Sequence, residues 1–300
     1  MKEAAKILAY LIGIVVLGSL LAPPLWWAGQ AVAPHFPWLA FLETTDFQRF
    51  FNRAILIAAI LLLWPTIRWL RIGSLGGLGL EPNPRRFRDF GIGFAIASLS
   101  LFALGAVLLQ AGTFRLKAEL PWDDLPGILV TALVVATIEE SLFRGGIQGL
   151  VARSAGPRVA LWFVAALFSI VHFLKPREEV IAEVGWGSGF ALVPHAFWQF
   201  GDPARLIAGF TTLFAVGLIL GHVTLRTRSL ALAIGLHAGW VFALKTFSRL
   251  TKRLDRDVLP WLGDNLLEGV GPLLVLAVTW VAVLLCLRHR SHETLVHGRP

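Results

Sequence analysis

The sequence contains one cysteine, Cys286, and it has few charged residues: Asp, Glu, Lys and Arg make up 15% of its 300 residues. A single thiol excludes a disulfide framework and the multi-cysteine sites of zinc fingers and iron–sulfur clusters. Hydrophobic residues make up 56% of the chain, which excludes an intrinsically disordered protein. Soluble domains are about 45–50% apolar and about 25% charged, so this composition also differs from theirs.

Long apolar runs predict membrane-spanning helices. A hydrocarbon core of about 30 Å is crossed by about 20 apolar helical residues. The runs do not alternate between apolar and polar residues, so they are not typical of barrel strands. We therefore predict an all-α fold, a polytopic membrane helix bundle of about eight transmembrane helices. The predicted segments are 5–22, 51–70, 90–111, 125–153, 157–174, 205–225, 229–247 and 270–287.

The first of these segments has two interpretations. Lys2 and Lys6 precede or begin the apolar run and Ala31-Val32-Ala33 follows it, as in a cleavable signal peptide. The run is long, however, and Trp26 and Trp27 are residues typical of a membrane interface. We expect a retained helix.

The net charge of +8 does not indicate nucleic-acid binding. The basic residues are scattered between the apolar runs, which is typical of the flanks of membrane helices. Two longer connections, 71–90 and 175–204, contain the glycine and proline residues that break helices. The first is expected to lie at the membrane surface, and the second to act as a lid or access element.

Ionisable residues inside predicted membrane helices are costly, and they mark candidate functional sites. Glu140 and Arg144 are four residues apart, so on a helix they can form an ion pair. Glu139 points about 100° away from Glu140 and has no partner on its own helix. A carboxylate in such an apolar setting suits a general base.

Three histidines also lie in predicted helices. A Gly156-Pro157 turn is predicted to join the fourth and fifth helices, with Glu139 and His172 each about 16 residues, or about 24 Å, from it. Antiparallel packing would bring those two residues to one level. His237 could reach the same depth, although its match is poorer. His222, near a helix end, is expected to be interfacial or structural.

These residues form a pattern that resembles the CAAX prenyl protease and bacteriocin-processing (Abi) family of glutamic-type intramembrane proteases. The first motif is Glu139-Glu140-Ser141-Leu142-Phe143-Arg144 and the second is Phe168-Ser169-Ile170-Val171-His172. The third block contains LGHVTLRTRSL and IGLHAGW, with His237 in the latter. The resemblance covers about 125–245. We expect N-terminal transmembrane helices and a basic linker over 1–124, a protease-like core with these motifs over 125–245, and a last helix with a basic tail over 246–300.

The resemblance implies an intramembrane endopeptidase. Glu139 would act as general base on a water molecule, aided by His172, while His237 would stabilise the oxyanion or orient the same water. Glu140, Arg144 and Phe168 would support them. No metal is favoured, although two histidines and a carboxylate could instead form a zinc site with an open water position. No HExxH motif is present.

One position departs from the family. Its members commonly carry Asn four residues after the last motif histidine, where this chain has Val241. Valine cannot donate a hydrogen bond, and loss of an oxyanion donor costs about 10²–10³ in rate. Three alternatives follow: the activity is reduced, another donor replaces the Asn, or the chain is a non-catalytic binding or immunity protein.

The expected partners are the lipid bilayer and a membrane-tethered peptide or protein substrate. The expected location is a bacterial cytoplasmic membrane. A transporter would need a polar pathway or two related halves with broken helices, and we find neither in the sequence.

Overall fold

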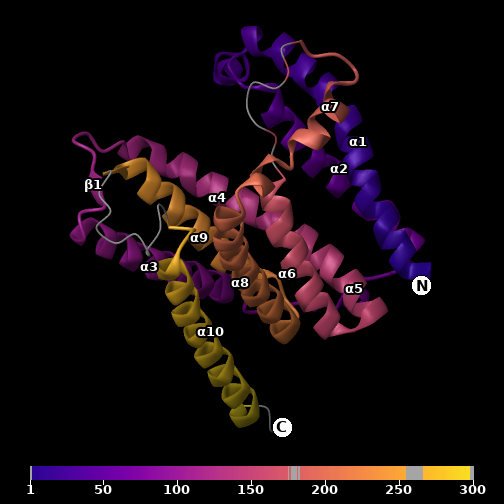
Figure 1. The fold of residues 1–300 in the computed structure, drawn as a ribbon. Coiled ribbons are helices and arrows are strands. Elements are labelled where there is room, and N and C mark those ends of the chain that lie inside the picture. Colours follow the sequence, from indigo (N-terminus) through magenta and orange to yellow (C-terminus); the bar gives the residue numbers. More distant parts are fainter. Residues whose placement is uncertain (1, 175, 177–180, 182, 255–265, 298–300) are drawn as a thin grey trace.

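A computed structural model describes residues 2–174, 176, 181, 183–254 and 266–297 (Figure 1). Ten α-helices make up most of this described part. They are α1 (Lys2–Val32), α2 (Phe47–Trp69), α3 (Arg86–Gln110), α4 (Leu125–Glu140), α5 (Gln148–Ala155), α6 (Pro157–Phe173), α7 (Ser188–His195), α8 (Pro203–Thr227), α9 (Ala231–Leu250) and α10 (Val270–His297).

Seven helical spans in the described residues are long and apolar enough to cross a membrane. They are Ala5–His35, Phe47–Trp69, Arg86–Gln110, Trp122–Ala155, Leu206–Thr227, Ala231–Leu250 and Val270–Arg288. The remaining predicted segment, 157–174, corresponds to the shorter apolar helix Pro157–Phe173. The prediction of a polytopic membrane helix bundle is confirmed, and its count of about eight is close. The difference arises because α6 has 17 residues, fewer than the about 20 that a full crossing needs.

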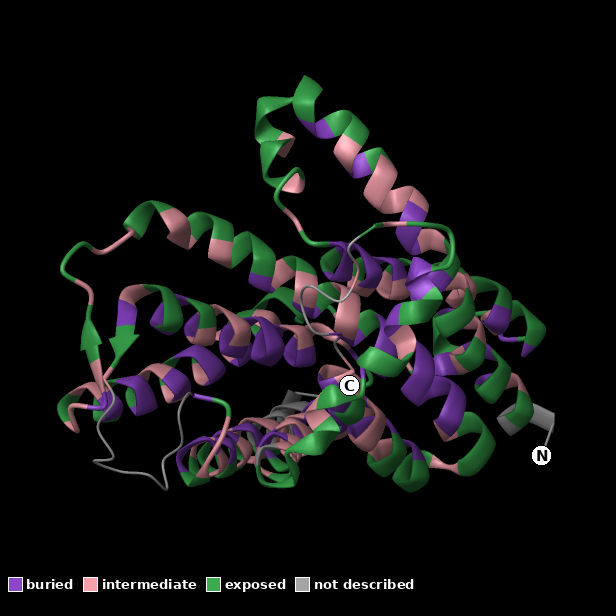
Figure 2. Cartoon of the chain, turned by 45° about the horizontal axis from the view of Figure 1, so that its top comes forward, coloured by how far each residue is buried: buried purple, intermediate pink, exposed green. Residues whose placement is uncertain are grey.

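The helix α1 is longer than the predicted segment 5–22. It continues through Pro23 and Pro24 to Val32 and packs against α2, where the Tyr10 hydroxyl donates a hydrogen bond to the Ala59 carbonyl at 2.9 Å. Buried residues follow the facing sides of the packed helices, while exposed ones cover their outer sides (Figure 2). Large apolar side chains are among the exposed ones, as expected where helices face lipid.

The helices α3 and α9 approach each other closely, and glycine makes this possible. A Cβ atom at Gly235 would lie 2.2 Å from the Phe90 carbonyl oxygen, and one at Gly239 would lie 2.5 Å from that of Phe94. Small residues of this kind let helix backbones pack tightly in membranes. His237 lies between these two glycines, so its position on α9 is fixed by the contact with α3.

The predicted Gly156-Pro157 turn is present. Gly156 has a φ of +90° and ends α5, and Pro157 begins α6. α6 then packs against α8, where a Cβ atom at Gly217 would lie 2.8 Å from the Cα atom of Ala165. The turn therefore brings α6 back beside α5, which continues the helical segment that carries Glu139 and Glu140.

The predicted segment 125–153 contains a change of helix type. After Glu140 the chain forms a π-helical segment, Ser141–Ile147, and then continues as α5. Short π-helical segments inside membrane and globular helices occur frequently at functional sites. This one follows directly on the two glutamates and contains Arg144.

Two further features differ from the sequence-based expectation or extend it. β1 (Phe114–Leu116) pairs antiparallel with β2 (Thr251–Arg253), a sheet too short to leave a sequence pattern.

In the connection 175–204, α7 packs tightly on α1: a Cβ atom at Gly189 would lie 2.0 Å from the Ser19 carbonyl oxygen. The hypothesis that this connection is a lid falls partly on residues 175, 177–180 and 182, which lie outside the described residues.

Candidate active site

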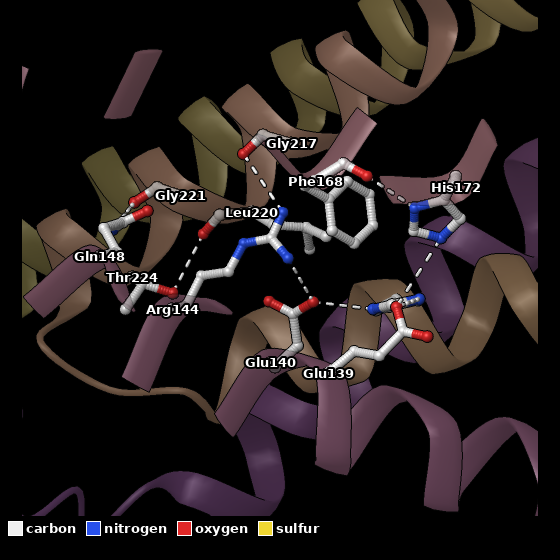
Figure 3. A network of polar contacts seen from close by, with 11 residues as sticks. Glu139, Glu140, Arg144, Gln148, Phe168, His172, Gly217, Leu220, Gly221 and Thr224 are labelled. Atoms are coloured by element: carbon white, nitrogen blue, oxygen red, sulfur yellow. Dashed lines mark hydrogen bonds and ion pairs between the residues drawn. The ribbon is translucent and has the colours of Figure 1, made fainter. Parts of the chain in front are cut away.

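Glu140, the second of the two adjacent glutamates, is fully buried. Its Oε1 atom accepts a hydrogen bond from Arg144 Nη1 at 2.9 Å and another from His237 Nδ1 at 2.7 Å. Arg144 is also buried, and it forms the predicted i,i+4 ion pair with Glu140 (Figure 3). Each charge therefore has a partner in a setting where an unpaired charge would be costly.

Phe168 of α6 covers this ion pair. The Arg144 guanidinium lies 4.3 Å from the centre of the Phe168 ring, a cation–π distance. Arg144 Nη2 also donates to the Gly217 carbonyl of α8 over 3.5 Å. The pair thus links α4 and its π-helical continuation to α6, α8 and α9.

Glu139 faces a different environment. Its side chain is 22% exposed, and its Oε2 atom lies 3.8 Å from His172 Nε2 and 3.9 Å from His237 Nε2. Within the described part of the chain this oxygen has no hydrogen-bond partner. α4, α6 and α9 thus bring the three candidate residues together. His237, for which the sequence indicated the poorer match in depth, is as close to Glu139 as His172 is.

The hydrogen bonds at Nδ1 determine what each imidazole offers at Nε2. His172 Nδ1 lies 2.7 Å from the Phe168 carbonyl oxygen, which can only accept a hydrogen bond (Figure 3). His237 Nδ1 faces the Glu140 carboxylate in the same way. Both Nδ1 atoms therefore carry hydrogen, and in the neutral rings both Nε2 atoms are acceptors directed toward Glu139 Oε2.

Glu139, His172 and His237 line one cavity of about 380 Å³. Its remaining surface is mostly apolar and comes mainly from α8, α9, α10 and the residues just before α10, with single residues of α3, α4 and α6. The apolar lining residues include Leu213, Val216, Leu244, Leu266, Val275 and Leu276. A mainly apolar cavity with a few converging polar groups is typical of a substrate site.

Two neighbouring residues of α9 also line this cavity. Val241 is one of them, so the position where the family commonly has Asn does face the cavity here. The other is Trp240, which the sequence analysis did not single out. Trp240 is three residues after His237 and so lies on the same helix face. This spacing is the feature of the sequence that could have identified it.

His222 lies elsewhere in the bundle. Its ring contacts Trp280 of α10 edge-on, with 4.8 Å between ring centres, and it is not among the residues that line the cavity. This placement agrees with the expectation of a structural histidine.

A zinc site would need nitrogen, oxygen or sulfur donor atoms placed around one point. Two imidazole nitrogens and a carboxylate are a suitable chemical set for zinc. Over the described residues, however, no group of three or more His, Cys, Asp or Glu side chains is arranged to hold a metal ion. We therefore derive no step through a metal.

Comparison with protein families gives one match. Residues 121–243 match the model of the Rce1-like family, described as type II CAAX prenyl endopeptidase Rce1-like. The matched range contains all three residues that meet at the cavity. No curated protein and no solved structure matches the chain.

Proposed function

We propose that the protein is an intramembrane endopeptidase, because residues 121–243 match the Rce1-like family of type II CAAX prenyl endopeptidases. It would hydrolyse peptide bonds of membrane-associated proteins or peptides with water activated by Glu139. The observation that carries the proposal is the position of Glu139 Oε2, 3.8 and 3.9 Å from two imidazole Nε2 atoms at the wall of an apolar cavity.

These distances suit a water molecule between the three groups. They are too long for direct hydrogen bonds, and polar groups more than about 3.5 Å apart are candidates for a bridging water. The water would donate one hydrogen to Glu139 Oε2 and the other to an imidazole Nε2. Glu139 then accepts the proton as the water oxygen attacks the peptide carbonyl carbon.

One of the two histidines orients the water in this scheme, because a water with one hydrogen on Glu139 has only one more to donate. The Nδ1 atoms of both rings are held by the Phe168 carbonyl and the Glu140 carboxylate, so the acceptor nitrogens face the water. Because His237 Nδ1 donates to the Glu140 carboxylate, its Nε2 atom can accept a hydrogen from the water, which supports a role in orienting the water. Glu140 and Arg144 keep the His237 ring and α4 in place.

The cavity supports a substrate class as well as a reaction. Its lining is apolar around the polar wall, so it suits an apolar stretch of a peptide that reaches the site from the bilayer. Exclusion of bulk water by such a lining strengthens the electrostatic interactions at the reacting bond.

The test compares peptide termini in membranes that hold the wild-type protein or Glu139→Ala at equal levels. We expect new termini only with the wild type, and their sequences identify the substrates. Thermal unfolding of both purified proteins controls for folding. Equal termini in the two membranes, with both proteins folded, would contradict the proposal.

A second candidate function is favoured by Val241 on the cavity wall. Without a donor there, the chain could be a non-catalytic membrane binding or immunity protein of the same family. Glu139→Gln separates the two functions because it keeps the size of the side chain and removes the base. A cellular phenotype that survives this change would favour binding.

A further inference from the structure

The cavity has a second unpaired polar group besides Glu139. Of the described residues that line it, two have a buried polar atom with no hydrogen-bond partner: Glu139, at Oε2, and Trp240, at Nε1. We propose that the Trp240 indole N–H donates a hydrogen bond to the oxygen of the scissile carbonyl and stabilises the negative charge that forms there. This inference rests on the proposed endopeptidase function.

Peptide hydrolysis needs such a donor. When water attacks the carbonyl carbon, a C–O bond forms, the water proton passes to Glu139, and the carbonyl π electrons move to the oxygen. Collapse of this intermediate breaks the C–N bond, and Glu139 returns the proton to the leaving nitrogen. A donor placed at the oxyanion lowers the barrier to its formation.

The other polar lining residues do not supply this donor. The imidazole Nε2 atoms of His172 and His237 are acceptors in the neutral rings, because each Nδ1 atom carries the hydrogen. The Thr212 hydroxyl is bonded to the Ala208 carbonyl at 3.2 Å. Val241 has no polar atom, and Lys245 is exposed at the edge of the cavity.

Trp240 meets the chemical requirement. Indole Nε1–H is a donor only, so it cannot compete with Glu139 for the water's hydrogens. The residue is 8% exposed, and a buried N–H without an acceptor is rare and unfavourable in folded proteins. A carbonyl oxygen of a bound substrate would satisfy it.

The position of Trp240 on α9 also fits. Residues three apart lie on the same helix face, about 4.5 Å apart along the axis, so Trp240 is one turn from His237. Glu139 Oε2 lies 3.9 Å from His237 Nε2. A peptide group in the cavity can therefore receive water from the side of Glu139 and His237 while its oxygen faces the next turn of α9.

The experiment must remove the N–H without removing the ring, because Trp240 also packs in the core cluster with Leu101, Leu236 and Leu276. Incorporation of 3-benzothienylalanine at position 240 replaces the N–H with sulfur and keeps the bicyclic shape. We expect kcat for a cleaved peptide to fall about 10²-fold, with KM within about twofold of the wild type. The same replacement of Trp280, which contacts His222 outside the cavity, is the matched control and leaves kcat unchanged.

Two results would overturn the inference. The first is an unchanged kcat. The second is a rise in KM at constant kcat, which would mean that the N–H binds substrate and transition state equally. Glu139→Ala is measured beside these variants. If it abolishes cleavage while the position-240 replacement retains full kcat, the inference fails and the endopeptidase function stands. Cleavage that persists in Glu139→Ala contradicts the proposed function itself.

Discussion

The two adjacent glutamates of α4 face two different regions of the molecule. Glu140 lies in a buried polar cluster with Arg144 and His237, where its Oε1 atom accepts two hydrogen bonds. Glu139 lies on an apolar cavity, is 22% exposed, and has an Oε2 atom with no hydrogen-bond partner in the part of the chain described. Glu140 Oε2 also has no hydrogen-bond partner among the described residues, so the two neighbours differ in that Glu140 accepts two hydrogen bonds at Oε1, whereas Glu139 faces two imidazoles at 3.8 and 3.9 Å.

This difference separates stability from reactivity. A buried carboxylate with cationic and imidazole partners holds helices together, and loss of one partner leaves the others unpaired. A carboxylate without partners adds little to stability but remains basic enough to take a proton. His237 belongs to both regions, because its Nδ1 atom contacts Glu140 and its Nε2 atom faces Glu139.

The largest effect is expected on the Glu139 side. Glu139→Gln keeps the size of the side chain and removes the base, so we expect kcat to fall about 10⁴-fold, the upper end for general base catalysis. The free energy of unfolding should change by less than about 0.5 kcal/mol, because Glu139 Oε2 accepts no hydrogen bond from the described residues. Single-turnover cleavage and chemical unfolding in mixed micelles measure the two quantities. A stability loss that matches the loss of activity would mean that Glu139 has a structural role.

The matched change on the other side is Glu140→Gln. It removes the charge that faces Arg144 and leaves that cation buried, which should lower the free energy of unfolding by about 3–5 kcal/mol. The measurement is chemical unfolding under the same conditions as for Glu139→Gln. If the two variants were equally stable, the distinction between a structural and a reactive carboxylate would be wrong.

A smaller effect is expected for Phe168→Leu. This change removes the ring that lies 4.3 Å from the Arg144 guanidinium but keeps the backbone carbonyl that binds His172 Nδ1. Loss of a buried cation–π contact costs about 2 kcal/mol of stability. We expect kcat to change less than about threefold, as measured with the same peptide. A loss of kcat as large as that for Glu139→Gln would place Phe168 in the reaction itself.

Much of the fold follows from hydropathy. Backbone N–H and C=O groups in the bilayer must be hydrogen-bonded within the protein, and a long apolar run meets this requirement as a helix. The Gly156-Pro157 turn and the spacing from it also predicted that Glu139 and His172 meet. The depth of His237 was less clear from its spacing. Gly235 and Gly239 fix that depth through contact with the backbone of α3, which the sequence alone does not reveal as a contact.

The features that the sequence analysis missed depend on local geometry. The π-helical segment Ser141–Ile147 leaves no hydrophobic pattern of its own within a long apolar run. The strand pair β1–β2 is three residues long on each side, below the length at which alternation is recognisable. In the sequence, Trp240 does not differ from the other apolar residues of its helix. In the structure it lines the cavity and has a buried Nε1 atom with no hydrogen-bond partner among the described residues.

The smallest effect is expected for Val241→Asn, which places an amide donor on the cavity wall one turn from His237. If Trp240 already supplies the oxyanion donor, a second donor adds little, and kcat in the otherwise unchanged chain should stay within about threefold. In the Trp240→Phe background the same change should raise kcat about tenfold, because part of the 10²–10³ that one such donor contributes is restored. Four proteins measured with one peptide give both ratios: the wild type, each single variant and the double variant. A gain of about 10² from Val241→Asn alone would show that the cavity had no working donor, and Trp240 would then be a packing residue only.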